Sequence, residues 1–383
     1  MSTPEPSEPE LFDPATGPTC GWPAEAAMER AYLEAFAGGS SALIANLRTQ
    51  VLGLRCGERV FPVTVNEAEY GDAYVCLPHS AYALYAKAEL GLVDVGPWAP
   101  ALAALASAAG AAMRAGRLNK IVHVGNWMLS TNLHGGWPGD GLPAIRELLV
   151  RRFPDHFLAA RSLNEWSDAA LVERFRRDGW RLLPSRQIYV TDDLDRDWSS
   201  KRNTQRDVRL LSRTPFSFDP LDTLRPGDGA RIAELYAMLY LGRYSTLNPA
   251  FTPAFIEMTH RERIFTYRGL RGADGALAAV VGCFVRGGVL TTPIVGYDTG
   301  RPAEEGLYRM ASVLFAQEAQ ARGLRLNGSA GAADFKRHRG ARPVLEYTAY
   351  FADHLAWPRR AVIGGMSRML NSVAAPLLAE RGL

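Results

Sequence analysis

The order of elements at the end of each half of the chain is the feature that most restricts its fold. In the first half, GLPAIRELLVRRFPDHFLAARSLN is followed by LVERFRRDGWRLLPSRQIYVTDD. In the second half, GLYRMASVLFAQEAQARGLRLN is followed by AADFKRHRGARPVLEYTAYFAD. Each half predicts a helix that opens with Gly-Leu, a strand ending in Leu-Asn, a short basic helix, a glycine and a long aromatic strand. We interpret this as a diverged tandem duplication; a chance likeness of two α/β units is the alternative.

Hydrophobic periodicity predicts helices and strands in alternation along both halves. The helices are predicted at residues 22–38, 97–115, 142–153, 168–178, 199–212, 232–241 and 307–322. The strands are predicted at residues 49–54, 60–66, 73–77, 120–133, 156–160, 185–191, 265–269, 276–286, 289–297, 324–327 and 344–351. Such an alternation indicates sheets covered by helices.

Composition indicates an ordinary globular chain of 383 residues, 47% hydrophobic and 22% charged, long enough for two cores. The net charge of only +3 gives no overall attraction to polyanions, so nucleic-acid binding would need a local basic patch. The seven histidines show no HxxxH or HxH spacing, and no metal site is predicted. The four cysteines form no CxxC pair, which excludes a zinc ribbon or redox dithiol: Cys20, Cys56, Cys76 and Cys283.

Four segments are predicted along the chain. Residues 1–20 are rich in Pro, Glu, Ser and Thr and read as a disordered leader without the features of a signal peptide. Residues 21–195 and 196–357 form the two domains, and residues 358–383 a helical tail. The alanine-rich stretch at residues 98–113 is too short to span a bilayer, so no membrane insertion is expected. Scattered free cysteines suit a cytoplasmic protein.

The stretch GSAGAADFKRHRGARPVLEYTAYF, from Gly328 to Phe351, resembles the last helix and strand of GNAT-superfamily acyltransferases. The doubled arrangement, in which the basic helix SSKRNTQRDVRLL leads into the second copy, resembles FemXAB-type double-GNAT acyltransferases. The resemblance covers Thr49 to Asp353 as an order of elements. It implies an α/β (α+β) fold of two tandem GNAT-like mixed sheets flanked by helices, with a degenerate first domain and the active cleft in the second.

The resemblance also implies an activity. It implies an N-acyltransferase that moves an acyl group from acyl-CoA or a carrier thioester to an amine of a small-molecule acceptor, for instance in specialised biosynthesis. In such a domain two parallel strands separate around the donor carbonyl; here these would be residues 289–297 and 324–328. Acyl-CoA or aminoacyl-tRNA would be a co-substrate, with no permanently bound cofactor. The alternatives are a Fem-type aminoacyltransferase with tRNA as partner, and a non-catalytic binding module.

Two positions depart from the GNAT pattern. The expected phosphate loop is YDTGRPAEEGLYRM, which offers Gly300, Arg301 and Gly306 but places Glu304 and Glu305 where they would repel phosphate. At the last helix, where many members carry a tyrosine, this chain has a lysine after Phe335. Both departures disfavour ordinary acetyl-CoA binding and are shared in kind by Fem-type enzymes.

Basic residues are the candidates for donor binding. Lys336, Arg337 and Arg339 directly follow the Gly/Ala bend, and Arg301 lies in the expected phosphate loop. The alternative for the basic run is a solvated helix face. In the helix at residues 199–213, four arginines share one face: Arg202, Arg206, Arg209 and Arg213. They favour salt bridges to the other domain, or else a phosphate track to which Arg206 and Arg209 would contribute.

Candidates for catalysis lie at the ends of the predicted strands. Asp298, after Tyr297, is a candidate proton acceptor, although an aspartate there also suits a turn. Glu346 and Tyr347 on the last strand are weaker candidates. The polar residues of GNWMLSTNL and of the loop GRYSTLNPAFT are candidates for the acceptor site or else satisfied structural groups. They are Asn126, Trp127, Ser130, Thr131, Asn132, Tyr244 and Asn248.

Overall fold

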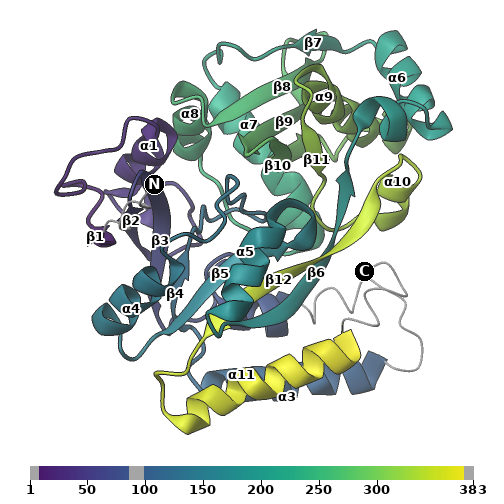
Figure 1. The fold of residues 1–383 in the computed structure, drawn as a ribbon. Helices are drawn as coiled ribbons and strands as arrows, with labels where there is room; N and C mark the ends of the chain where they lie inside the picture. Colours follow the sequence, from purple (N-terminus) through teal and green to yellow (C-terminus); the bar gives the residue numbers. More distant parts are fainter. Residues whose placement is uncertain (1–7, 86–98, 375–383) are drawn as a thin grey trace.

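A single mixed sheet forms the centre of the molecule (Figure 1). The computed structural model describes residues 8–85 and 99–374. Within these residues the sheet has twelve strands. They are β1 (Glu10–Phe12), β2 (Gln50–Cys56), β3 (Arg59–Glu67), β4 (Lys120–Val124), β5 (Phe157–Asn164), β6 (Arg181–Thr191), β7 (Ser217–Asp219), β8 (Phe265–Arg271), β9 (Leu277–Arg286), β10 (Val289–Tyr297), β11 (Arg325–Asn327) and β12 (Arg342–Phe351).

Helices flank the sheet. They are α1 (Ala27–Phe36), α3 (Ala99–Ala115), α4 (Leu142–Arg152), α5 (Glu165–Arg177), α6 (Arg202–Arg213), α7 (Asp228–Ala237), α8 (Pro253–Arg261), α9 (Leu307–Ala321), α10 (Ala333–Arg337) and α11 (Trp357–Met369). A π-helical turn, η5 (Met238–Tyr244), continues α7. The predicted α/β architecture is therefore confirmed, and the bounds of β10 agree with the prediction.

The last strand of each half lies in the sheet of the other half. The strand order is β1-β2-β3-β4-β5-β12-β6-β11-β10-β9-β8-β7. Each half contributes antiparallel neighbours and then one parallel pair, β4 with β5 and β10 with β11. Beyond that pair, β5 is followed by β12 and β11 by β6, both antiparallel. The two halves thus repeat one order of strands, but they share one continuous sheet instead of forming two separate ones.

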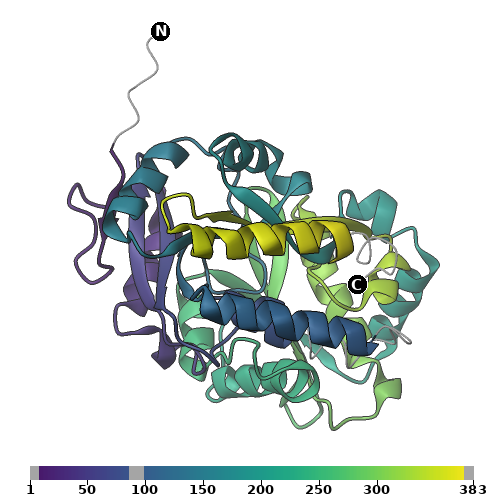
Figure 2. The same cartoon turned by 90° about the horizontal axis from the view of Figure 1, so that it is seen from below.

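Four hydrophobic clusters fill the space between sheet and helices. One lies between α4, α5 and the first-half strands, and another between α9 and the second-half strands. A third joins α1, α7 and α8 to both halves. The fourth lies below the central strands, where α3 and α11 run side by side (Figures 1 and 2). Burying each large apolar side chain contributes about 1.5–3 kcal/mol, so these clusters hold the exchanged strands in place.

Several predicted segments are corrected by the structure. The disordered leader was predicted too long, because β1 pairs with β2 through Leu11 opposite Leu54. No strand forms at residues 73–77, and residues 74–76 form a turn. The strand predicted at residues 120–133 ends at Val124, because Gly125 and Met128 take positive φ values of 67° and 53°. The limits of the two domains stay a prediction.

Candidate functional site

Strands β10 and β11 pair in parallel over three residues and then separate. Their register ends with Thr291 opposite Asn327, whereas β10 continues to Tyr297. At the same point β10 bulges against β9, since the register shifts between Thr291 and Ile294. The predicted separation of two parallel strands in the second half is therefore present.

A bend at residues 328–332 continues from β11 and is held by Lys336. The Lys336 ammonium donates to the carbonyl oxygens of Gly328 (2.6 Å), Ser329 (3.1 Å) and Ala330 (2.8 Å). The bend also pairs with β6, because the Gly328 amide donates to Tyr189 O (2.8 Å). The bend therefore uses all three N–H groups of the ammonium. Binding of the acyl donor by Lys336 stays a prediction.

Lys336 titrates far from the usual range of a lysine. Burial, and next the Arg186 charge, lower its pKa from 10.5 to about 7. A neutral amine has two N–H donors where the ammonium has three, so deprotonation leaves one carbonyl of the bend without its partner. The protonation of Lys336 and the geometry of the bend are therefore coupled near neutral pH.

The other predicted donor-binding residues of the basic run have carboxylate partners. Arg337 is exposed and donates to Asp334 (2.7 Å). Arg339 donates from Nε to buried Asp207 (2.6 Å), and its guanidinium lies 3.4 Å from the centre of the Phe335 ring. These pairs support neither arginine as a free phosphate ligand.

The loop between β10 and α9 is closed by ion pairs in a similar way. Arg301 pairs with Glu305 at 2.6 Å. Asp298 accepts from Arg231 Nη2 (2.9 Å) and from the Gly300 amide (3.0 Å), which is the turn geometry that was the alternative to a proton acceptor. The structure thus gives Asp298 a structural role that competes with the predicted catalytic one.

The two tyrosines predicted as catalytic lie in different places. Tyr297 accepts from Arg243 Nη1 (3.2 Å) in the second half. Tyr347 packs with the hydrophobic cluster beneath α5 in the first half, and burial raises its pKa. Its neighbour Glu346 belongs to a separate polar cluster on the central strands. The structure therefore does not bring Tyr347 to Tyr297.

Aromatic side chains gather near the end of β10. Tyr297 lies 6.0 Å from Tyr308, and Tyr308 lies 4.8 Å from Phe335, measured between ring centres. Tyr244, a predicted acceptor-binding residue, lies 5.8 Å from Tyr240. The Tyr244 ring remains 46% exposed. The group includes Tyr308 of α9 and Phe335 of α10, so it packs these two helices beside the end of β10.

Asn248, the second predicted residue of that loop, is a structural group. It is buried and donates from Nδ2 to the carbonyl oxygens of Tyr240 (3.1 Å) and Ser245 (2.9 Å). Its own carbonyl accepts from Asn46 Nδ2 (2.7 Å) in the first half. These bonds tie the two halves together and leave Asn248 no free donor for an acceptor.

The remaining predicted acceptor-binding residues form the loop at residues 125–133, which follows β4. Asn126 is buried and donates to Thr64 Oγ1 (2.9 Å) and Val75 O (3.0 Å). These bonds satisfy it within the protein, as the structural alternative required. The loop occupies the place beyond β4 and β5 that corresponds to the separated strands of the second half.

The far end of this loop contacts the centre of the sheet. Trp127 is buried and its amide donates to Asn132 Oδ1 (3.0 Å). Ser130 O and Thr131 Oγ1 both accept from Arg186 Nη2, at 2.6 and 2.9 Å. The loop is therefore the scaffold of an arginine and not an open pocket wall.

Two arginines of the central strands were not predicted as site residues, whereas their neighbour Glu346 was a weak candidate. Arg161 lies on β5 and Arg186 on β6, and Arg186 pairs with Glu346 on β12 through Nε at 2.7 Å. Within apolar strands a single charge carries no periodic signal. Only the exchange of β6 and β12 brings these residues together, so the sequence offered no means of finding them.

The arginine face of α6 is open. Arg202, Arg206, Arg209 and Arg213 are exposed, and within residues 8–85 and 99–374 none of them forms a salt bridge. The favoured prediction was that these arginines form salt bridges to the other domain, and the described residues contain no such salt bridge. The phosphate track that was its alternative remains a hypothesis.

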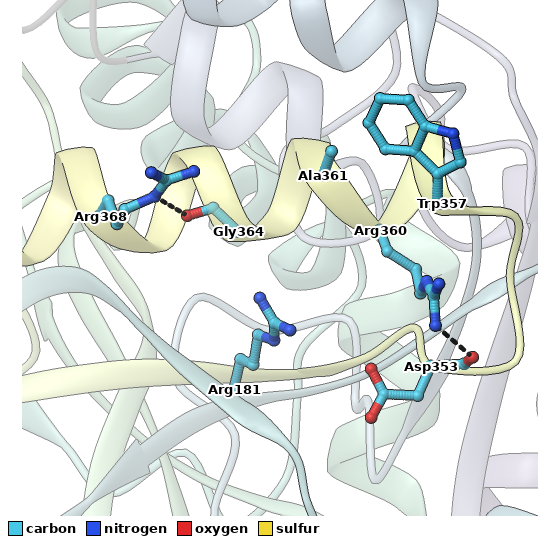
Figure 3. A pocket seen from close by; sticks show the side chains of 7 residues that line it. All are labelled: Arg181, Asp353, Trp357, Arg360, Ala361, Gly364 and Arg368. Carbon is cyan, nitrogen blue, oxygen red and sulfur yellow. Dashed lines mark hydrogen bonds between the residues drawn. The ribbon is translucent and has the colours of Figure 1, made fainter.

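A hollow of about 280 Å³ lies beside α11 (Figure 3). Its lining residues are Arg181, Asp353, Trp357, Arg360, Ala361, Gly364 and Arg368. Arg360 donates to Asp353 O (3.4 Å) and Arg368 to Gly364 O (3.4 Å). None of the residues that line it belongs to the separated strands, so we do not place the chemistry there.

Among the described residues no group of three or more His, Cys, Asp or Glu side chains could hold a metal ion. None of the helices in that part of the chain is long and apolar enough to cross a bilayer.

Comparison with known proteins gives similar structures only. No family profile and no curated protein matches the sequence. Among solved structures, the C-terminal domain of a putative lysylphosphatidylglycerol synthetase from Agrobacterium fabrum is 15% identical, with a TM-score of 0.46 over 65% of this chain and 80% of that one. FemX is 8% identical, with a TM-score of 0.43 over 55% and 75%. A tandem GNAT protein from the clavulanic acid biosynthesis pathway is 12% identical, with a TM-score of 0.42 over 91% and 99%. The chain is thus similar to tandem GNAT and FemX structures, as the sequence resemblance predicted.

Proposed function

We propose that the chain is an N-acyltransferase that moves an acyl group from an activated donor to an amine of a small-molecule acceptor. The observation that carries the proposal is the separation of β10 and β11 at a bulge, beside a lysine whose pKa is about 7. Backbone amides at separated strands can polarise a carbonyl, and positioning then supplies most of the acceleration.

The reaction needs no covalent enzyme intermediate. The amine nitrogen attacks the donor carbonyl carbon, the bond from that carbon to sulfur or oxygen breaks, and the proton that the nitrogen loses passes to the leaving group. Lys336 has a pKa near neutrality and can give or accept a proton there. Asp298 is held by Arg231, so it is the weaker candidate for proton transfer.

The loop after β10 limits how the acyl donor could bind. Arg301 pairs with Glu305, and a side chain at Gly306 would meet Leu210 at 2.6 Å, so this loop forms no open phosphate cradle of its own. We propose an acyl-CoA or carrier thioester whose charged part extends beyond this loop. The open arginine face of α6 favours aminoacyl-tRNA as a second candidate, because an RNA backbone would match a row of exposed cations.

The experiment combines the purified chain with acyl-CoA thioesters or aminoacyl-tRNA and a panel of primary amines. Thiol release and product mass report transfer. We expect Lys336→Ala to lower kcat at least tenfold, while Arg337→Ala, its exposed neighbour, keeps activity within about twofold. Transfer at the parent rate by Lys336→Ala, or no amide product with any donor, would count against the proposal.

The donor classes are separated by the arginine face. The charge-reversed Arg206→Glu/Arg209→Glu variant should lose transfer from aminoacyl-tRNA but keep transfer from a short acyl-CoA. Equal activity of parent and variant with aminoacyl-tRNA would exclude the second candidate.

A further inference from the structure

Two arginines on the central strands are held by one loop. Arg161 Nη1 donates to Val75 O (2.9 Å) and Leu129 O (3.3 Å). Arg186 Nη2 donates to Ser130 O, the next carbonyl along the loop (2.6 Å). The two guanidinium groups therefore lie side by side, although they come from β5 and β6, which flank β12.

A chain of contacts joins these arginines to the lysine at the bend. Arg186 Nη2 donates to Thr131 Oγ1 (2.9 Å), and Thr131 Oγ1 donates to Ser329 Oγ (3.1 Å). Ser329 O in turn accepts from Lys336 Nζ (3.1 Å). The cluster of Arg161, Arg186 and Lys336 thus reaches from the first half to the end of the separated strands.

The cluster has more positive than negative charge. Glu346, 3% exposed, pairs with Arg186 through Nε and Nη2 at 2.7 and 3.2 Å. Within the described residues Arg161 forms no salt bridge; it donates to carbonyl and amide oxygens, and its guanidinium lies 5.8 Å from the centre of the Tyr74 ring. His123 adds no further cation, since burial and then the Arg161 charge lower its pKa to about 3. Three basic groups therefore share one carboxylate.

Arg161 has one edge that these contacts leave open. All its hydrogen bonds come from Nη1, so the edge formed by Nε and Nη2 has no partner among the described residues. Arg186 uses the same edge to hold the carboxylate of Glu346 through two bonds. Such an edge matches a planar carboxylate better than it matches a point acceptor. Arg161 is half-buried, so part of the residue meets solvent.

We propose that the open edge of Arg161 binds a carboxylate of the acceptor, so that the acceptor is an amine that also carries an acid group. The identity of the ligand as an acceptor rests on the proposed acyl transfer, whereas the carboxylate site itself does not. The loop at residues 125–133 and the bend connect the carboxylate to the separated ends of β10 and β11, where the amine would react.

Binding of malonate, a carboxylate probe, tests the site without a donor or turnover. Titration calorimetry at constant ionic strength should show that Arg161→Gln weakens malonate binding about tenfold or more relative to the parent. Arg161→Lys keeps the charge without the planar edge and should lie between the two. Arg337→Gln, at an exposed arginine of the same region, should bind as the parent does.

The outcomes separate this inference from the proposed function. Malonate binding that depends on Arg161, in a protein without transferase activity, would support the site and count against acyl transfer. Equal malonate affinity in parent and Arg161→Gln would overturn the site even if transfer occurs. Should Arg161→Gln fail to fold, the comparison of parent with Arg161→Lys decides. Tighter binding of inorganic phosphate than of malonate at this arginine would overturn the carboxylate assignment.

Discussion

Replacement of Glu346 by glutamine tests whether one buried carboxylate balances the central cluster. The side chain keeps its size and one oxygen acceptor, but it loses its charge. Arg186 then retains its bonds to Ser130 and Thr131 and no longer faces an anion. Three basic groups remain without a carboxylate, so the variant should lose stability.

The magnitude follows from the two bonds between Arg186 and Glu346. Each charge-assisted hydrogen bond is worth about 1.5–3 kcal/mol, and the glutamine oxygen keeps a neutral bond worth about 1 kcal/mol. We therefore expect Glu346→Gln to lower the free energy of unfolding by about 2–5 kcal/mol, as is usual when one partner of a buried pair is removed. With about 2.1 cal/mol/K of unfolding entropy per residue over 383 residues, Tm should fall by about 2.5–6 °C.

Thermal and urea unfolding at constant pH measure this loss. The control is Glu165→Gln, because Glu165 pairs with Arg176 at 2.8 Å on the surface and should contribute less than about 1 kcal/mol. Chloride or malonate should recover part of the loss in Glu346→Gln, since an anion can replace the missing charge. A Tm within 1 °C of the parent, with no gain from added anion, would refute the idea of a cluster balanced by Glu346.

Three further predictions concern the second half. Asp207→Asn should lower the free energy of unfolding by about 3–5 kcal/mol, because Asp207 is 1% exposed and pairs with both Arg309 and Arg339. In the same urea unfolding assay, Asp334→Asn at an exposed pair should lower it by less than about 1 kcal/mol. Gly340→Ala should lower the free energy of unfolding by at least about 2 kcal/mol, because its φ is +87° and a Cβ would lie 1.9 Å from Asp197 O. Gly331→Ala, at a φ of +76° with open space around the Cβ position, should lower it by about 1 kcal/mol. Equal losses in the two variants would contradict the clash. The pKa of Lys336 is lowered from 10.5 to about 7, so between these pH values the unfolded chain binds more protons and the parent should gain stability over Lys336→Met as pH rises; a pH-independent difference in unfolding free energy would argue against the shift.

The sequence predicted those elements that local periodicity determines. The bounds of β10 were correct, and α9, predicted at residues 307–322, ends one residue earlier at Ala321. The parallel pair of β10 and β11 was also expected, because the resemblance to GNAT domains implies two parallel strands there. The end of β4 at Val124 was missed, since the apolar residues Trp127, Met128 and Leu129 that follow suggest a longer strand. There the backbone turns through Gly125 and satisfies the buried Asn126 instead.

The candidate site was less accessible to the sequence than the fold. The basic run from Lys336 to Arg339 suggested anion binding, but charges on a short helix give no sign of nearby acceptors. The structure places carbonyls against Lys336 and a buried aspartate against Arg339, both through contacts distant in sequence or within a bend. Arg161 and Arg186 are single charges in apolar strands, and they become neighbours only through long-range pairing.

The exchange of β6 and β12 also has a consequence for how the chain is made. Asn164 of β5 pairs with Glu346 of β12, about 180 residues later, so β5 lacks its final neighbour until nearly the whole chain has left the ribosome. At synthesis rates of about 5–20 residues per second, that neighbour arrives roughly 10–40 s after β5 itself. During this interval the nascent first half exposes an unpaired sheet edge, which is a surface for aggregation or for a chaperone. Neither half alone would be a finished domain, and cutting the gene between them should yield two fragments that fold only when both are present together.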